Sequence, residues 1–466
     1  MKIAIFNTNK GKGLRLLVSL FLTATLISCN KYLDVQPKGS RLLKTVNDYN
    51  LWLNNYALEA EMPRELNLLS DLVDNVTIPS PPVDAIDRVY SWQDQFDQKV
   101  TGTAYIWYNY YQSIYLFNAV IYNIDGAENG TAQQKNALKA EALLGRALDY
   151  LSLVNLYGKQ YNAATADKDL AVPFVTTLDI SDKLPNRSTV KEIYGHIIAD
   201  INEALTNLPA DNKSNRYRGS VAAAYSVLAR TYLYMGDYQK AADNAGKALS
   251  SGQFTITDYS TLAPYAQLPA MIRSTSEIYA RQSSTYYLQE IPTLDFLKSF
   301  DKNDLRLKLW YDQSSDPNFT QRGKTVYYPY GNLVGNGYPD WGTSAAEMYL
   351  IIAEAAARAN NLPLALDQLD IVRKKRFLPA NYVKYQSTNQ DDVLKRVLAE
   401  RTFEFPYNGL RWFDMKRLAA ENRMPEVDRY DASGQKIASL PPNSTKYTLQ
   451  IPAQVMYFNA NWQQNP

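Results

Sequence analysis

Charged residues gather in the stretch LAERTFEFPYNGLRWFDMKRL, where two carboxylates stand four positions apart. On a helix Glu400 and Glu404 would share one face. Two carboxyl groups roughly 5 to 9.5 Å apart are the machinery of glycoside hydrolysis. Arginines nearby, however, can hold carboxylates through paired hydrogen bonds. We therefore predict scaffold ion pairs and no catalytic residue. The same prediction applies to the other charged residues of this stretch and to two charged residues of the stretch KNDLRLKLWY. The full set is Glu400, Arg401, Glu404, Arg411, Asp414, Asp304 and Arg306.

Aromatic side chains are the second group that could do chemistry, since the chain has 36 Tyr, 14 Phe and 7 Trp. A Tyr or Trp in a loop offers a flat face on which a sugar ring stacks, and polar neighbours would bind the hydroxyls. For any one ring, the alternative is that it covers the core under a long loop. We predict that at least two or three candidates, Trp92 and Trp341 foremost, form a ligand platform. The candidates are Tyr90, Trp92, Tyr286, Tyr287, Trp310, Tyr311, Tyr328 and Trp341.

The single cysteine, Cys29, follows a basic head and a short apolar run. The run from Leu16 to Ile27 is too short to cross a hydrocarbon layer of roughly 30 Å, which needs about 20 residues. A basic head, a short apolar body and a small residue before the cut are typical of a secretory signal peptide. The four basic residues of the head are Lys2, Lys10, Lys12 and Arg15.

A lone cysteine forms no internal disulfide, so its position needs another explanation. The sequence Leu26-Ile27-Ser28-Cys29 resembles a bacterial lipobox, in which the thiol is acylated, for example with palmitate. We predict a signal peptide over residues 1–28 and a mature domain over 29–466, tethered to a membrane by lipid on Cys29. Several acyl chains anchor a protein firmly, whereas one binds only marginally. The alternative is an ordinary signal peptide with an incidental cysteine.

The composition of the mature chain excludes several function classes. The signal peptide carries four of the 49 basic residues and none of the 47 acidic ones, which leaves a net charge of −2. No positive field therefore indicates a nucleic-acid partner. One histidine leaves little room for histidine-based catalysis or a zinc site. No Asp-rich loop demands calcium, so calcium binding stays open on the sequence, and we predict no metal-ligating residue and no cofactor.

Apolar residues recurring with a helical period predict long helices that would position these groups. Four aromatic residues recur with this helical period and are predicted to pack in the core: Phe117, Tyr150, Tyr232 and Tyr238. The second helix has a broad apolar face predicted to include Tyr105, Tyr108, Ile114, Phe117, Val120 and Ile121. The predicted segments are residues 42–58, 104–124, 134–158 and 190–209, the last with Ser188 or Thr189 as its N-cap.

Residues 222–253 and 347–376 each predict two helices joined by a short turn. In each, two alanines 12 positions apart would let antiparallel helices approach closely: Ala229 with Ala241, and Ala353 with Ala365. This is the tetratricopeptide helix-turn-helix pattern. The predicted fold class is therefore mainly α, with a tetratricopeptide-like helical-repeat scaffold.

The sequence between these helix pairs is different in kind. Residues 251–342 are rich in Tyr, Ser, Thr, Asn, Pro and Gly, with a short helical stretch at 291–300. A loop-rich insertion of this length inside a helical framework is usually functional, so we predict that it carries the ligand-binding region. The tail over 433–466 is also predicted to be irregular, with a possible strand at 447–454.

Six local features, spread over nearly the whole chain, combine into a recognisable pattern. They are CNKYLDVQP at 29–37, SIYLFNAVIYNI at 113–124 with ALLGRALDYLSLVNLYGKQY at 142–161, the two helix pairs, KNDLRLKLWY at 302–311, the charged stretch at 398–418, and LQIPAQVMYFNANWQQNP at 449–466. Together they resemble the SusD/RagB family of outer-membrane lipoproteins from Bacteroidetes-type bacteria. One departure is Phe405-Pro406-Tyr407, beside the charged signature, where most members differ.

The resemblance implies a helical scaffold that supports a large irregular region, and it implies a role. Such proteins sit at the outer face of the outer membrane and capture nutrients, most often oligosaccharides. They form a lid over a SusC-like TonB-dependent transporter, which imports the ligand. Ligand-contacting loops differ between members, so the resemblance implies no shared site.

Two other functions stay open on the sequence. A helical glycoside hydrolase or lyase would require two carboxylates that converge in a deep cleft with room for a sugar. A peptide-binding scaffold of the tetratricopeptide type would use the concave surface of the helix pairs.

Overall fold

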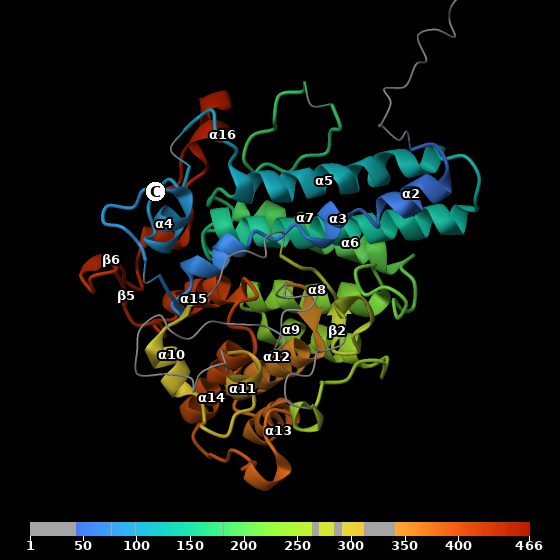
Figure 1. Ribbon diagram of the computed structural model, residues 1–466. Coiled ribbons are helices and arrows are strands. Elements are labelled where there is room, and N and C mark those ends of the chain that lie inside the picture. Colours follow the sequence, from blue (N-terminus) through green and yellow to red (C-terminus); the bar gives the residue numbers. More distant parts are fainter. Residues whose placement is uncertain are drawn as a thin grey trace, which may run out of the picture. The chain divides into compact units, whose positions relative to one another are not determined.

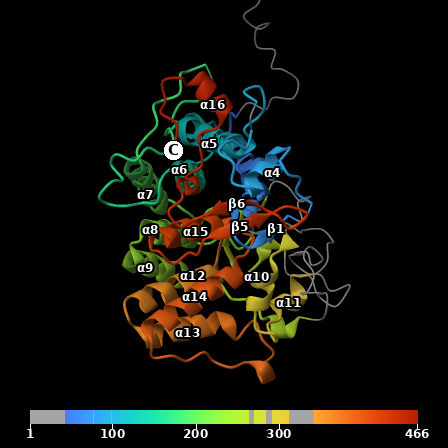
Figure 2. The ribbon, with the colours of Figure 1, turned by 90° about the vertical axis from the view of Figure 1, so that its left-hand side faces the viewer.

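The structure, a computed structural model, describes residues 43–466 apart from Val76, Gln98, Ile180 and the stretches 263–269, 284–290 and 312–340. Within this part the chain is mainly helical, which confirms the mainly α part of the predicted fold class, and the strands form short two-stranded ladders. The long helices lie above a stack of shorter helices in Figure 1, and the same order of layers is seen from the side in Figure 2.

Three long helices form the first layer: α5 (Tyr105–Asn123), α6 (Ala132–Tyr157) and α7 (Val190–Leu205). Helix α6 packs against both α5 and α7 and is buried almost all round from Leu138 onward. At Gly145 an added Cβ would lie 2.1 Å from a Phe117 ring carbon, so the ring packs on the α6 backbone itself. Thr189 is the N-cap of helix α7. Its hydroxyl accepts from the backbone N–H of Glu192, and the Glu192 carboxylate accepts from the Thr189 N–H.

The predicted helical segment at 42–58 is two helices rather than one. Helix α2 (Val46–Trp52) ends before Asn55, whose side chain caps the short helix α3 (Tyr56–Glu59). Asn disfavours helix interiors and favours caps because its side chain bonds nearby backbone groups. The indole of Trp52 donates to the carbonyl of Leu116 (3.0 Å), which fastens α2 to α5.

Both predicted helix pairs are present. Helices α8 (Val221–Met235) and α9 (Tyr238–Leu249) form the first, and α12 (Ala345–Arg358) and α13 (Leu362–Arg373) the second. The turns contain Gly236 and Asn360, both in the left-handed conformation that these residue types tolerate. The four alanines are fully buried, as the close approach requires: Ala229, Ala241, Ala353 and Ala365. Helix α9 also packs on α12, so the two pairs stack, and α14 (Gln390–Glu404) packs on α12 and α13.

Short ladders fasten the insertion to this stack. Strand β2 (Glu277–Tyr279), inside the loop-rich region, pairs with β4 (Thr343–Ser344), which directly follows that region. Strand β1 (Val73–Asp74) pairs with β3 (Ile291–Pro292). Helix α10 (Leu294–Ser299) follows within the stretch predicted to be helical, capped by Thr293.

The C-terminal tail is more regular than predicted. Strands β5 (Val427–Tyr430) and β6 (Lys436–Leu440) form a hairpin, and a short helix α16 (Ala453–Phe458) lies near the end. The predicted strand at 447–454 is wrong. There the backbone bonds elsewhere: the Leu449 N–H donates to the carbonyl of Leu156, and the Ile451 N–H donates to the side chain of Gln464.

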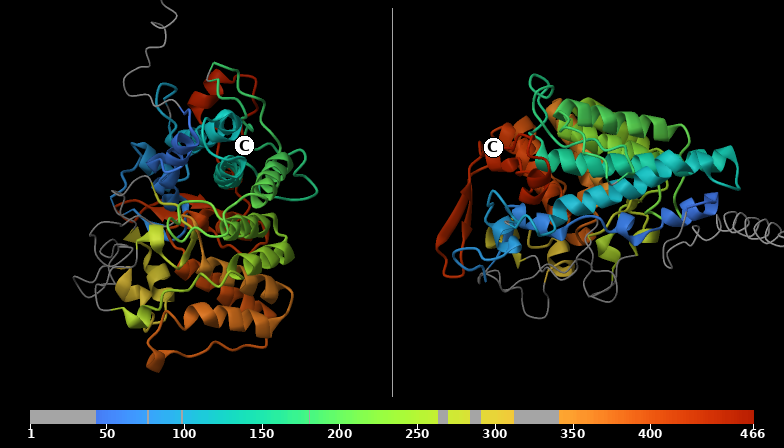
Figure 3. Two further views of the ribbon diagram at one scale, coloured as in Figure 1. Left: turned by 90° about the vertical axis from the view of Figure 1, so that its right-hand side faces the viewer. Right: turned by 90° about the horizontal axis from the view of Figure 1, so that it is seen from above.

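Figure 3 shows the fold from two further sides. The remaining described elements are short, apart from the eleven-residue α15. They are α4 (Ala85–Tyr90), α11 (Arg306–Leu309), α15 (Leu410–Ala420), η1 (Arg64–Leu69), η2 (Ile124–Gly126), η3 (Tyr259–Thr261), η4 (Met271–Arg273), η5 (Pro379–Asn381) and η6 (Thr445–Tyr447).

Candidate functional site

The carboxylates of the charged motifs are bound to arginines in the interior, as predicted. Arg306 is fully buried, and its guanidinium lies 2.6 Å from Asp304, 2.7 Å from Glu400 and 2.9 Å from Glu404. Arg376 also pairs with Glu404. Burial alone would raise the pKa of Glu404, but Arg376 and Arg306 hold that pKa below its ordinary value.

A second part of the network joins α14 to α15. Arg401 lies 2.8 Å from Asp414, and Arg417 lies 2.8 Å from the other oxygen of the same carboxylate. Burial alone would raise the pKa of Asp414, yet these two arginines keep that pKa below its usual range. Arg411 forms a bidentate pair with Asp71 at 2.7 and 2.6 Å. The network therefore ties the last helices to the scaffold and leaves none of its carboxylates free to act as acid or base.

Five of the predicted platform residues are buried, which corrects the prediction for them. Tyr90 and Trp92 are 1% and 2% exposed, and the Arg429 guanidinium lies 4.3 Å from both ring centroids. The Trp92 indole donates to the carbonyl of Leu69 (3.0 Å), and the Tyr90 hydroxyl donates to Asp74 (3.1 Å). A sugar would find these ring faces already occupied.

The other three of the five face inward as well. Trp310 packs edge-on to Tyr259, with ring centroids 6.0 Å apart. Tyr311 lies against Phe296 and Phe300 in an aromatic cluster within the insertion. Trp341 covers Gly409 so closely that a Cβ there would lie 1.8 Å from its ring. These rings cover the core, which is the alternative that the sequence left open.

The last three predicted residues, Tyr286, Tyr287 and Tyr328, lie outside the described residues. Their assignment to a ligand platform stays a prediction.

Exposed aromatic rings occur instead on α5. Tyr105 and Tyr108 were predicted to face inward, and that is wrong: they are 64% and 48% exposed. Tyr115 and Tyr122 are 42% and 44% exposed on the same helix. We call these four residues the tyrosine strip. The seven-residue spacing of positions 108, 115 and 122 could have revealed it, since residues two turns apart share a face.

A second exposed aromatic pair lies at the other end of the chain. Tyr457 and Phe458 of α16 are 66% and 73% exposed, with ring centroids 5.2 Å apart. Helix α16 lies beside the N-terminal end of α5 in Figures 1 and 2. A small cavity there is lined in part by Ala104 and Ile106 of the α5 start and by Pro452, which precedes α16.

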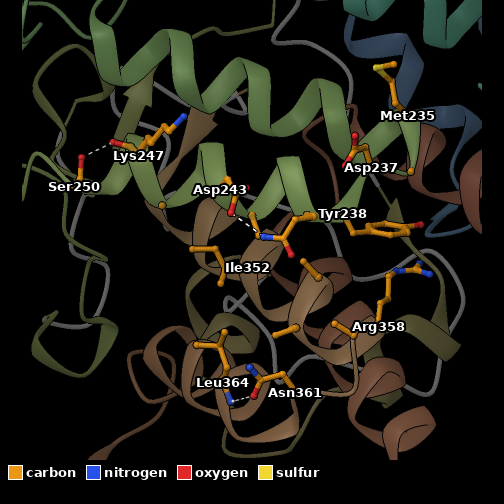
Figure 4. A pocket seen from close by; sticks show the side chains of 17 residues that line it. Met235, Asp237, Tyr238, Asp243, Lys247, Ser250, Ile352, Arg358, Asn361 and Leu364 are labelled. Atoms are coloured by element: carbon orange, nitrogen blue, oxygen red, sulfur yellow. Dashed lines mark hydrogen bonds between the residues drawn. The ribbon is translucent and has the colours of Figure 1, made fainter.

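An open groove of about 1100 Å³ runs between the two helix pairs (Figure 4). One wall is the end of α8 and the outer side of α9, and the other is α12 with the start of α13. Small side chains make much of its lining: Gly236, Ala242, Gly246, Ala355, Ala356 and Ala359. Its shape is therefore a smooth trough between helices rather than an enclosed pocket.

The polar groups of this groove are already used by the scaffold. Arg358 stacks on the Tyr238 ring at 4.1 Å and pairs with Glu354 and Glu421. The Tyr238 hydroxyl donates to Glu421 (2.7 Å), and Asp237 caps α9. The two carboxylates that line the groove are also engaged, because Asp237 pairs with Lys240 and Asp243 accepts from the Gln239 amide (2.8 Å).

Two further observations bear on the function classes. In the described part of the chain, no three or more His, Cys, Asp or Glu side chains come together as a metal site would require. Among those same residues, none of the helices has the length and apolar character needed to cross a bilayer.

Comparison with known proteins identifies related sequences over nearly the whole chain. A family model described as "SusD family" matches residues 212–466, and one described as "Starch-binding associating with outer membrane" matches residues 31–233. A SusD-like protein P2 of Formosa agariphila is 25% identical over 415 residues, which cover 77% of this chain and 79% of that protein.

Solved structures share the fold. A SusD superfamily protein from Bacteroides thetaiotaomicron aligns with a TM-score of 0.73 and 20% identity, over 91% of this chain and all of that one. A SusD-like carbohydrate binding protein from Bacteroides vulgatus aligns with a TM-score of 0.68 and 20% identity, over 90% of this chain and 97% of that one.

Proposed function

Because the chain belongs to the SusD family, we propose that it is a cell-surface lipoprotein that binds oligosaccharides and passes them to a transporter without cutting them. Family membership carries the proposal. It is supported by the second family match, whose description names starch binding, and by a relative of the same fold that is described as a carbohydrate binding protein. In this proposal the protein raises the local concentration of ligand over the transporter mouth.

The absence of catalysis in the proposal is supported by the charged motifs. Their carboxylates are paired with buried arginines, and a glycosidase needs one protonated and one ionised carboxyl group with access to substrate. A helical hydrolase or lyase is therefore the weaker reading of these residues.

The partner in this proposal is a SusC-like TonB-dependent transporter, and the anchor is lipid on Cys29 at the outer face of the outer membrane. The scaffold would be of the tetratricopeptide type, with α8–α9 and α12–α13 as two of its repeats. The open groove between these pairs favours contact with a protein partner over contact with a small ligand, because its floor is smooth and its polar groups are occupied.

The test uses the purified mature protein and two measurements on the same samples. Electrophoresis through gels that contain a soluble polysaccharide reports binding as slower migration. An assay for new reducing ends reports cleavage. We expect retardation by at least one polysaccharide and no new reducing ends. Release of sugar would show an enzyme, whereas binding of peptides without retardation by any polysaccharide would indicate a peptide-binding scaffold.

The partner is tested separately, by affinity purification from detergent-solubilised membranes of the native host. We expect a large outer-membrane transporter to copurify in defined proportion. Recovery of small peptides alone would contradict the assignment of the partner while leaving glycan binding untouched.

A further inference from the structure

We propose that the tyrosine strip of α5 is a binding surface for neutral, extended oligosaccharides, and that its rings make the stacking contacts. The inference rests on the proposed function and deepens it by naming a surface and a ligand class. The strip comprises Tyr105, Tyr108, Tyr115 and Tyr122, each more than two-fifths exposed.

The exposure of these rings is unusual for a helix in a helical scaffold. The opposite face of α5 is buried, with Trp107, Tyr110, Ile114 and Phe117 packed inward. The strip therefore is not needed for the core. A tyrosine presents a flat apolar face together with a hydroxyl, which suits a surface that must stay wet when empty and stack on a sugar when occupied.

The spacing along the helix fits an extended chain of sugars. Tyr108, Tyr115 and Tyr122 repeat every seven residues, which is about 10.5 Å at 1.5 Å rise per residue. Such a repeat drifts by only about 20° per step, so the three rings stay nearly in line. This is close to the length of two sugar units in an extended glycan, so successive rings would meet every second unit.

The residues between the rings are small or polar. Ala119 stands between Tyr115 and Tyr122 along the helix, so no large side chain interrupts the line there. Gln112 is exposed between Tyr108 and Tyr115, and its amide donates to the Tyr108 hydroxyl (3.1 Å). An amide carbonyl and phenolic hydroxyls are groups that exchange hydrogen bonds with sugar hydroxyls.

At least one ring is held in place before any ligand arrives. The Tyr122 hydroxyl accepts from Arg146 (3.0 Å). Arg146 is buried, and it is fixed by a bidentate pair with Asp200 (2.9 Å for each bond) and by Asn118 (2.8 Å). A ring that is already oriented loses less conformational entropy on binding.

Charge decides between the possible ligands. The 19 residues of α5 include no Asp, Glu, Lys or Arg. Acidic polysaccharides and anionic lipid surfaces are recognised through Lys and Arg, which this helix lacks. A neutral glycan needs only ring faces and neutral hydrogen-bonding groups. Tyr457 and Phe458 of α16, beside the N-terminal end of α5, extend the exposed aromatic surface, and α16 has no charged residue either.

The test compares the double variant Y108A/Y115A with Tyr430→Ala, which removes an exposed tyrosine of β5 away from the strip. Each is run in gels that contain a neutral polysaccharide (soluble starch, a β-glucan or a galactomannan) or an acidic one (alginate or pectin). We expect the double variant to lose affinity for the neutral ligand by about tenfold or more, with Tyr430→Ala unchanged. Tyr108→Phe, which keeps the ring, should lose less than Tyr108→Ala. Circular dichroism checks that each variant is folded.

The possible outcomes distinguish a failure of this inference from a failure of the proposed function. Retardation of the double variant equal to that of the wild type overturns the strip and leaves glycan binding standing. Wild-type binding to acidic polysaccharides alone, or binding to anionic vesicles that the double variant loses, overturns the neutral ligand class. A wild type that no polysaccharide retards contradicts the proposed function itself.

Discussion

Asp149 of α6 is completely buried, and neither of its carboxylate oxygens has a hydrogen-bond partner within the described residues. Burial, and next to it the charge of Glu61, raise its pKa well above the ordinary value for an aspartate. Glu61 is itself buried, and burial raises its pKa to about 7 although Arg281 donates to it at 3.0 Å. One arginine thus faces two carboxyl groups, so at neutral pH this pair holds a proton.

This buried pair predicts a stability that falls as pH rises. Both folded-state pKa values lie above those of the unfolded chain, so the stabilisation is complete below about pH 4 and is lost as pH rises through about 7. Asp149→Asn cannot ionise, so it removes one of the two carboxyl groups of this pair. We expect the free energy of unfolding of the wild type to fall between about pH 5 and about pH 8. The variant should fall less, and at about pH 8 it should be at least as stable.

Urea denaturation across this pH range measures the effect, with Asp200→Asn as the control. Asp200 is also buried but is paired with Arg146, so its amide variant should be destabilised at every pH. A wild type whose free energy of unfolding rises steadily from about pH 5 to about pH 8 would show that the pair holds no proton.

Arg306 gives a second prediction at this scale. Its guanidinium neutralises three buried carboxylates at once, so Arg306→Leu leaves them without their shared cation. Removing one partner of a buried pair costs about 3–5 kcal/mol of folding free energy. Urea denaturation at neutral pH should show a loss of that size, whereas Lys395→Ala, which breaks an exposed pair with Asp391, should change little. A loss below about 1 kcal/mol would mean that the network is dispensable.

At the scale of elements, helical period was enough to predict most long helices and both helix pairs. It could not say which way the aromatics face. In the sequence, polar residues flank both Trp92 and Trp341. In the fold, Arg429 covers the Trp92 ring and Gly409 makes room for the Trp341 ring. Each of these contacts joins residues more than 60 positions apart along the chain. Tyr105 and Tyr108 fit an apolar face by period, but their side chains are 64% and 48% exposed. Side-chain direction depended on distant segments that a local pattern does not contain.

The contact of Trp341 with α15 gives a prediction at this scale. Gly409, the N-cap of α15, has a φ of +69°, and its missing Cβ leaves room for the Trp341 ring. Gly409→Ala adds both left-handed strain, of about 1 kcal/mol, and a clash with the ring. We expect a loss of at least about 2 kcal/mol in folding free energy and a changed near-ultraviolet circular dichroism signal from tryptophan.

Gly246→Ala is the matched control. This glycine lies inside α9 with no atom within 4 Å of its added Cβ. Alanine is the better helix former by about 1 kcal/mol, so this variant should be slightly more stable than the wild type. Equal stability of the two glycine variants would contradict the close Trp341 contact.

At the scale of the whole molecule, the chain is fastened at its far end. The side chain of Asn465 donates to the carbonyls of Tyr157 (2.8 Å) and Leu449 (2.7 Å), and it accepts from Arg187 (2.6 Å). The last residues thus bind the end of α6 and the loop before α7. The motif Gln-Asn-Pro, which the sequence offered only as part of a resemblance, has a structural role in closing the fold.

The last prediction concerns where this closed fold resides. Cys29 lies outside the described residues, and serine differs from cysteine by a single atom, so we expect Cys29→Ser to leave folding and glycan binding unchanged. It should remove the proposed acyl chains, each of which contributes about 0.8 kcal/mol per buried CH₂. Expressed in the native host, the wild type should sediment with membranes and incorporate labelled palmitate, while the variant should do neither. Palmitate incorporation that survives the substitution would place the lipid elsewhere, and membrane association that survives without palmitate would mean that the transporter alone retains the protein.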